Sequence, residues 1–163
     1  MPQKKAQESE SAFKNWINAD LVSRIAAHLQ DHYADFDVKS FNKVSKELGP
    51  LELKPRVQLL RDALKAHLPE DYPKALALLL RAATKPKARV APLSGFDLWA
   101  FTEFIQKYGL EDFDESLAAL YELTQRFTAE FAIRPYLIHH EAKTLKVLHK
   151  WAKDKNHHVR RLV

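Results

Sequence analysis

Cysteine is absent from the 163-residue chain, and glycine occurs only three times. Without cysteine the chain can form neither a disulfide nor a cysteine-ligated zinc site, and its composition suits a reducing compartment. So few glycines disfavour a β-rich fold, because tight turns between strands usually need residues that accept a positive φ. Helices whose ends are marked by Asn, Asp and Pro fit this composition better.

Other segments that would indicate particular functions are also missing. No apolar run approaches the roughly 20 residues of a membrane-spanning helix, so we expect no membrane partner. Residues 1–11 are polar and lack the apolar core of a signal peptide. We therefore expect a cytoplasmic protein with a mobile tail over residues 1–11 and one domain over residues 12–163. No glycine-rich phosphate loop or serine nucleophile elbow is present, and we expect no cofactor.

Charge is distributed unevenly along the chain, whose formal net charge is +5. Residues 96–131 contain eight acidic and two basic side chains, whereas residues 143–163 contain seven basic side chains and one acidic one. Residues 81–92 add four basic side chains and no acid. Segregated positive charge suits a polyanion such as nucleic acid, although an uneven solvated surface produces the same pattern.

Apolar residues recur at helical spacing along most of the chain. Asn18, Asp37 and Asp114 can cap helices, because their side-chain oxygens can accept hydrogen bonds from the free amides of a first turn. Pro135 is expected to interrupt a helix, since the residue before a proline is pushed out of helical geometry. The expected helices are 19–34, 38–48, 52–68, 72–84, 96–108, 114–128 and 136–153, followed by one that begins near Asn156 and is truncated at the end of the chain.

These helices form successive pairs whose offset of roughly 35 to 45 residues is typical of helical-hairpin solenoids. A single amphipathic hairpin cannot bury its apolar face, whereas stacked neighbours can, and the stack curves to give a concave face. The pattern predicts an all-α fold, a superhelical array of antiparallel helix pairs of the HEAT-like kind. The alternative is a compact helical bundle. Trp16 and Trp151 are expected to be core anchors.

Several segments together resemble a known family. They are Leu51–Val57 (LELKPRV), His67–Pro73 (HLPEDYP), Leu98–Phe104 (LWAFTEF), Thr124–Pro135 (TQRFTAEFAIRP), Thr144–Ala152 (TLKVLHKWA) and His158–Val163 (HVRRLV). This combination is similar to the AlkC branch of the AlkC/AlkD family of DNA alkylation-repair glycosylases. The resemblance covers most of the chain from about Ala12 onward. In the family the segment matching HVRRLV is followed by Arg-, Pro- and Trp-rich sequence and further repeats, so we expect part of the DNA surface to lie outside this chain.

The resemblance implies a HEAT-like fold that cups duplex DNA on a basic concave surface. It implies an enzyme of the DNA-3-methyladenine glycosylase type, a monomer without a cofactor, which hydrolyses the N-glycosidic bond of N3- or N7-alkylated purines. Family members act without pulling the base into a pocket, unlike most glycosylases. The alternative is a HEAT-like module without catalytic activity that binds nucleic acid, or a protein partner through the acidic segment 96–131.

Trp99 and Glu103 are the first candidate catalytic residues. Four residues apart on a helix, they share one face, and that face points away from the apolar stripe of the same helix. The family uses an aromatic residue beside a carboxylate, and we carry that role to this pair. A carboxylate stabilises the positive charge that develops on the sugar when a cationic base leaves, and an indole face also favours a cation. The alternative is that Trp99 packs on a neighbouring hairpin and Glu103 is solvated.

Glu130 and Arg134 are the second candidate pair. With a helix break at Pro135 they would lie at an edge facing the DNA groove, Arg134 on a phosphate and Glu130 near the lesion. On a continuous helix they would instead form an ordinary ion pair between residues i and i+4.

Further DNA contacts are expected from the basic C-terminal region. Lys143, Lys146, Lys150 and Lys153 recur at intervals of three and four residues and so share a helix face, and Arg160 and Arg161 follow. A solvated lysine face is the alternative, and Arg160 could instead pair with Asp154 in a structural ladder. The adjacent pairs His139-His140 and His157-His158 each offer only one ligand to a given site, so no metal is expected.

Overall fold

The computed structural model describes residues 13–87 and 89–163, and this part of the chain contains helices and no strand. The all-α prediction is therefore confirmed for the described residues. The bounds of the elements are α2 (Ala19–Gln30), α3 (Val38–Asn42), the 3-10 helix η1 (Lys43–Glu47), α4 (Leu53–His67), α5 (Tyr72–Thr84), the 3-10 helix η2 (Gly95–Leu98), α6 (Trp99–Tyr108), α7 (Phe113–Thr124), α8 (Glu130–His139), α9 (Glu141–Trp151) and α10 (His157–Leu162). The polar tail predicted over residues 1–11 lies outside the described residues.

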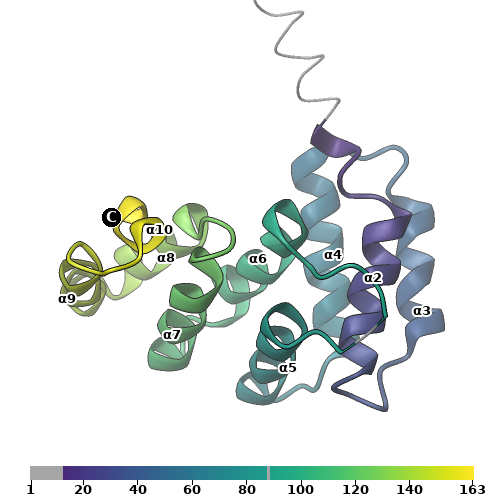
Figure 1. The fold of residues 1–163 in the computed structure, drawn as a ribbon, viewed down its shortest axis with the longest axis horizontal. Coiled ribbons are helices and arrows are strands. Elements are labelled where there is room, and N and C mark those ends of the chain that lie inside the picture. The colour runs from purple at the N-terminus through teal and green to yellow at the C-terminus, as the bar shows by residue number, and fades with distance from the viewer. Residues whose placement is uncertain (1–12, 88) are drawn as a thin grey trace, which may run out of the picture.

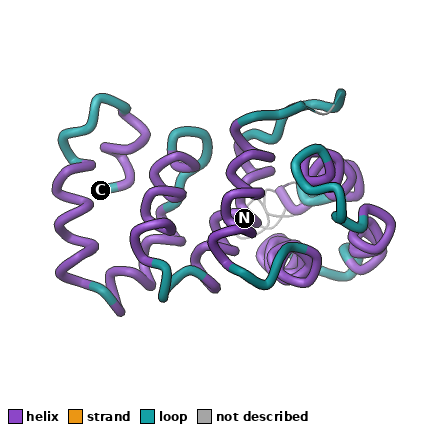
Figure 2. The backbone as a smooth tube through the Cα atoms, turned by 90° about the horizontal axis from the view of Figure 1, so that it is seen from below, coloured by secondary structure: helices purple, strands orange, loops and turns teal. Residues whose placement is uncertain are grey.

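The helices stack in chain order along the long axis of the molecule, from α2 and α3 at one end to α9 and α10 at the other (Figure 1). α4 packs against α6 and α6 against α8, while α5 packs against α7 in a second row. Figure 2 shows the molecule from below, with loops joining the successive helices; most of these loops are short, but residues 85–94 separate α5 from η2. This arrangement agrees with the predicted array of antiparallel helix pairs rather than with a compact bundle.

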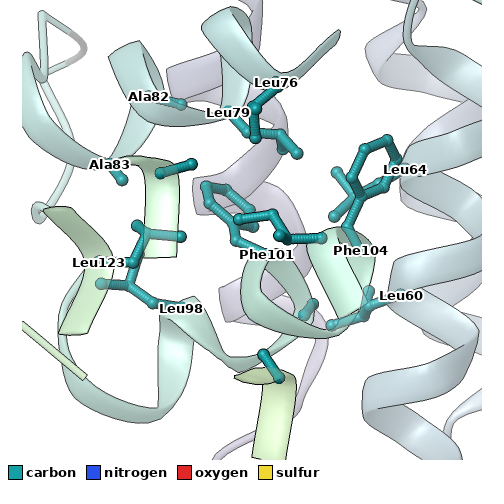
Figure 3. Close-up of a cluster of buried hydrophobic side chains, with 14 of the residues drawn as sticks. Leu60, Leu64, Leu76, Leu79, Ala82, Ala83, Leu98, Phe101, Phe104 and Leu123 are labelled. Carbon is teal, nitrogen blue, oxygen red and sulfur yellow. The ribbon is translucent and has the colours of Figure 1, made fainter. Parts of the chain in front are cut away.

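The core runs between the two rows of helices. Figure 3 shows side chains from α4, α5, α6 and α7 meeting in one cluster, which includes Leu64, Leu79, Phe101, Phe104 and Leu123. Each of these is at most 1% exposed. Because α6 is covered by α4 on one side and by α8 and α7 on others, it buries nearly all of its circumference. None of the described helices is both long and apolar enough to cross a membrane.

Side-chain caps fix several helix starts as the sequence predicts. Asn18 accepts a hydrogen bond from the Leu21 amide (3.0 Å), and Asp37 accepts one from the Ser40 amide (2.9 Å). Asp114, in contrast, does not cap α7 as expected. The N-cap is Asp112, and Asp114 lies in the first turn, where its charge still favours the positive end of the helix.

The expected break at Pro135 is wrong. α8 continues from Glu130 to His139 with Pro135 inside it. The proline removes the amide that would donate to the carbonyl of Phe131, a loss that costs about 3 kcal/mol or more in a helix interior. Packing compensates on both sides of Pro135, because Ala132, Ile133 and Tyr136 are all buried and the Tyr136 hydroxyl donates to the carbonyl of Ile105 (2.9 Å).

Candidate functional site

A continuous line of aromatic side chains crosses one edge of the molecule, and we call it the aromatic ridge. Its members come from segments far apart in the sequence: the residues before α2, the helix η2, the start of α6, the loop after α7 and the start of α8. They are Phe13, Trp16, Phe96, Trp99, Phe127 and Phe131. Phe13, Trp16 and Phe131 are 42%, 57% and 46% exposed, and the other three are half-buried. So much exposed aromatic surface in one place marks a binding surface.

Phe96 lies at the centre of the ridge and contacts four of the other five rings. Phe96 lies 5.7 Å from Phe13 and 5.9 Å from Trp16, between ring centroids, and 5.5 Å from Phe127. The centroid of the Trp99 ring lies 6.0 Å from that of Phe96 and 6.5 Å from that of Phe131, which is the last ring of the ridge. The rings of Trp99 and Phe131 are nearly parallel. Phe13, Trp16 and Phe131 each contact the ridge on one side only and are exposed to solvent on the other.

Local structure holds Phe96 and Trp99 in place. Ser94 and Asp97 form a capping box at the start of η2, and Gly95 between them has a φ of +55°, which a residue with a Cβ rarely adopts. The Asp97 carboxylate also accepts two hydrogen bonds from the Arg24 guanidinium, at 2.9 and 3.2 Å. The η2 turn is thereby fixed to α2, and the two aromatic side chains project from a rigid segment.

A buried arginine holds the other end of the ridge. The Arg56 guanidinium of α4 donates to the carbonyls of Lys14 and Ile17, at 2.9 and 3.0 Å. These two residues flank Trp16, so α4 anchors the segment before α2. Trp16 was expected to be a core anchor, and that expectation is wrong. Ile17 is 1% exposed and takes the core position, whereas the neighbouring Trp16 points out. Trp151 is 7% exposed and is a core residue as predicted.

Arg134 and Glu130 lie beside Phe131 at the end of the ridge. On the continuous helix α8 they form the ion pair between residues i and i+4, with 2.9 Å between Arg134 Nη2 and Glu130 Oε1. The Arg134 guanidinium also lies 4.7 Å from the centroid of the Phe131 ring. Both charged side chains remain more than half exposed. Thus Trp99, Glu130 and Arg134, three of the predicted site residues, are brought to one accessible surface.

Glu103 occupies a different environment from the one expected. Its carboxylate is not turned toward solvent, because α6 is buried on nearly all sides and Glu103 is 4% exposed. Its partner is Arg61 of α4, with 3.3 Å between Arg61 Nη1 and Glu103 Oε2. The expectation that Glu103 lies off the buried side of its helix is therefore wrong. No pattern in the sequence indicated that Arg61 would be the partner of Glu103.

Arg61 belongs to a wider polar network between α4 and α6. Its guanidinium donates two hydrogen bonds of 2.9 Å to the Asp62 carboxylate, which also accepts from Lys107 and Tyr108, at 2.9 and 2.7 Å. The hydrogen bonds from Arg61 hold the pKa of Asp62 well below its usual range. The pKa of Arg61 is raised in turn, chiefly by its hydrogen bonds with Asp62. This network fixes the angle of α6, and with it the position of Trp99.

The two C-terminal arginines have different surroundings. Arg160 donates to the backbone carbonyls of Asp154 and Lys155, at 2.7 and 2.8 Å, so it closes the turn between α9 and α10, a structural role. Arg161 lines a groove of about 460 Å³ beside the ridge, together with Phe127, Glu130 and His158. Arg161, unlike Arg160, therefore lies close to the other predicted site residues.

Neither Lys143 nor Lys150 lies at the ridge. All four lysines that were expected to contact DNA are exposed, but Lys143 lies over the ring of Phe113, the first residue of α7, whereas the ridge passes the opposite end of that helix. Lys150 lines a largely apolar groove of about 650 Å³ between α5, α7 and α9. That groove also contains the carboxylates of Asp114, Glu115 and Glu122, which disfavour a phosphate there. Lys146 and Lys153 have no contact in the structure that indicates a role.

Sequence reasoning missed most of the ridge. It singled out Trp99 but not Phe96, Phe127 or Phe131, because these residues come from three separate segments and no single spacing along the chain relates them. In the described part of the chain, no three His, Asp or Glu side chains gather in a way that could hold a metal ion.

Comparison with known proteins places these observations in context. No protein-family model matches the chain. It is 36% identical over 151 residues to the uncharacterized protein YhaZ of Bacillus subtilis, an alignment that covers 91% of this chain and 40% of YhaZ. The structure is similar, with a TM-score of 0.81 and 36% identity, to the Pseudomonas fluorescens alkylpurine DNA glycosylase AlkC bound to DNA containing an abasic site analog. That match covers 92% of this chain and 40% of AlkC, so the chain spans less than half the length of either relative.

Proposed function

We propose that this chain, a partial-length relative of AlkC with the same HEAT-like fold, is the DNA-gripping part of a DNA glycosylase for alkylated purines. The observation that carries the proposal is the likeness to a DNA-bound glycosylase along nearly the whole chain. The aromatic ridge, with Arg134 and Arg161 beside it, is the surface of this chain that fits a nucleic acid best. The partner is duplex DNA that contains a cationic N3- or N7-alkylpurine.

The proposed reaction is hydrolysis of the N-glycosidic bond. The bond between C1′ and the base nitrogen breaks, the base leaves with the bonding electron pair as a neutral purine, and water adds to C1′ and loses a proton. Positive charge therefore moves from the base to the sugar in the transition state. A carboxylate close to C1′ stabilises that charge and can orient the water. Removing one such electrostatic contact typically slows an enzyme by about 10²- to 10³-fold.

Geometry favours Glu130 as the carboxylate that reaches the nucleotide. Its side chain is 56% exposed, and it lies next to Phe131 and in the groove with Arg161. Trp99 offers an indole face at the same surface, where it would stabilise a cationic base or sugar. Arg134 is available for a phosphate, and binding of DNA would compete with Glu130 for this guanidinium.

Glu103 fits a positioning role better than direct contact. A carboxylate that is 4% exposed and paired with Arg61 cannot touch a nucleotide unless α4 and α6 separate. It lies one helical turn from Trp99, so the Arg61–Glu103 pair holds the indole in place. If Glu103 instead contacts the lesion, its isosteric replacement by Gln will abolish base release while the indole stays fixed.

The test is base release from methylated duplex DNA by the 163-residue chain. We expect Glu130→Gln to lower the rate by about 10²-fold or more. Glu141→Gln is the matched control, because it removes one exposed carboxylate from the neighbouring helix α9 and changes the net charge equally. Equal rates for both variants would show that Glu130 has no catalytic part.

A DNA-binding module without catalytic activity is the second candidate, and the 40% coverage of AlkC favours it. In that case the chain releases no base but still binds duplex DNA, and its affinity falls as salt rises because phosphate contacts displace counterions. Arg134→Ala should then weaken binding and flatten the salt dependence. Lys150→Ala, beside three carboxylates, should change binding much less.

A further inference from the structure

We infer that the aromatic ridge binds the bases of unpaired DNA, by stacking them on its exposed rings, in addition to any contact with duplex. The inference rests on the proposed function only for the class of partner, a nucleic acid. The form of nucleic acid follows from the geometry of the ridge itself. Trp16 and Phe13, at the end farthest from Glu130, take no part in the proposed cleavage and are still strongly exposed.

The spacing of the rings indicates separated bases. Neighbouring ring centroids along the ridge are 5.5 to 6.5 Å apart, and all the contacting pairs except Trp99 and Phe131 are tilted by 40° to 57°, so the ridge presents separate faces rather than a parallel stack. Bases along one strand of a duplex repeat every 3.4 Å or so, and their faces are already covered by their neighbours. Duplex bases therefore cannot match the ridge ring for ring. Bases that have left the stack are farther apart and present free faces, which is what aromatic side chains on single-strand binding proteins contact.

Polar groups beside Trp16 can contact the edge of a base that stacks there. A recess of about 370 Å³ adjoins the indole, and Asn15, Asn18, Ser94 and Arg24 line it. Ser94 and Asn15 are exposed and carry hydrogen-bonding side chains. An aromatic face next to donors and acceptors is how unpaired bases are held, whereas a paired base has its edge occupied by its partner. The carboxylate in this recess, Asp97, does not repel a strand strongly because it is paired with Arg24.

Charge at the other end of the ridge suits the phosphates between the bases. Arg134 lies over Phe131, and Arg126 and Arg161 line the groove beside Phe127. Glu130 is the one acidic side chain in that groove among the described residues. Aromatic faces with arginines alongside form the combination that binds single strands without sequence preference.

The experiment compares three DNA probes, each about a dozen nucleotides long, within the usual site sizes for single-strand binding. They are a labelled single strand, its perfect duplex, and the same duplex with a run of mismatches in the middle. Binding is measured by fluorescence anisotropy and by quenching of intrinsic tryptophan fluorescence. We expect the single strand and the mismatched duplex to bind more tightly than the perfect duplex, with quenching of Trp16.

Trp16→Ala should weaken binding of the single strand by about fivefold or more, the effect expected for loss of one stacked base. It should weaken binding of the perfect duplex much less, because the faces of paired bases are already covered by their neighbours and cannot stack on Trp16. The hydrogen bond that Trp16 donates to the carbonyl of Phe13 comes from its backbone amide, which the substitution keeps, and Ile17 supplies the core anchor, so the variant should fold. Ile138→Ala is the matched control, since Ile138 is 77% exposed on α8 and is not part of the ridge. Trp16→Phe, which keeps an aromatic face, should retain most of the affinity and lose the part of the quenching that comes from Trp16.

The outcomes separate this inference from the proposed function. If Trp16→Ala and Ile138→Ala have equal effects, or if Trp16→Ala weakens all three probes alike, the ridge does not bind unpaired bases. If the chain binds single strands through Trp16 but neither grips duplex nor releases base, the proposed function fails and this inference stands. If Trp16→Ala abolishes self-association of the chain in sedimentation and has no effect on DNA, the ridge is a contact between copies and the inference is overturned.

Discussion

The buried pair formed by Arg61 and Glu103 predicts an asymmetry between two substitutions. Arg61 has two partners, because it donates two hydrogen bonds to Asp62 and one to Glu103. The Glu103 carboxylate depends on that one hydrogen bond from Arg61. Arg61→Leu therefore leaves the Glu103 carboxylate buried without compensation. Glu103→Gln leaves Arg61 charged but still paired with Asp62, and the amide oxygen of Gln can accept the hydrogen bond that the carboxylate accepted.

The expected magnitudes follow from burial. Both side chains are largely covered, 11% exposed for Arg61 and 5% for Glu103, so solvent screens the pair only weakly. Removing one partner of a buried pair typically costs about 3 to 5 kcal/mol. We expect Arg61→Leu to fall in that range and Glu103→Gln to cost about 1 kcal/mol, the value of an ordinary hydrogen bond. The double variant Arg61→Leu/Glu103→Leu should be more stable than Arg61→Leu alone, because no charge is then stranded.

Urea unfolding of the wild type and the three variants, followed by circular dichroism at neutral pH, measures these differences. Equal costs for Arg61→Leu and Glu103→Gln, both below about 1 kcal/mol, would refute the reasoning, since a carboxylate exposed to solvent behaves that way. The same variants bear on catalysis. If Glu103 positions Trp99 through Arg61, base release and stability should fall together. If Glu103 touches the lesion, Glu103→Gln should abolish release and leave the urea midpoint almost unchanged.

Substitutions at three further positions test the contacts that support the fold. Gly109→Ala should destabilise the fold by about 1 to 3 kcal/mol in urea unfolding, because an added Cβ would lie 2.7 Å from the Tyr136 hydroxyl and closer still to two other oxygens. An unchanged midpoint would contradict this crowding. The pKa of Asp62 is depressed in the fold, so the stability that its charge contributes is present above about pH 4 and is lost as pH falls. Asp62→Asn should therefore make the free energy of unfolding depend less on pH in that acid range. If the variant and the wild type lose stability in parallel as pH falls, this explanation is wrong. Asn18→Ala should cost about 1 kcal/mol through loss of the cap on the Leu21 amide, whereas Asn18→Asp, which can still accept that hydrogen bond, should cost much less in the same assay.

The sequence by itself determined the helical elements and their order. Apolar spacing located the helices as far as α7, whereas α8 and α9 stand where one helix was expected over 136–153. Asn18 and Asp37 marked two starts correctly, because capping depends on a side chain and the amides of the turn that follows. Pro135 misled the same reasoning. Its local effect is to end a helix, but the buried contacts of Ile133 and Tyr136 on either side keep α8 continuous. Local preference was outweighed there by tertiary packing.

Only the tertiary structure decided which residues share a surface. Trp99 could be selected from the sequence, yet the ridge around it is assembled from segments that begin as far apart as Phe13 and Phe131, and no periodicity within one helix relates them. The burial of Glu103 could not be predicted from the sequence either. Its helix has one apolar stripe in the sequence, but α6 is enclosed on nearly every side, so a carboxylate that local periodicity turns outward is buried against Arg61 of another helix. The periodicity of a helix defines its apolar side, and only the packing of its neighbours determines how many of its sides are covered.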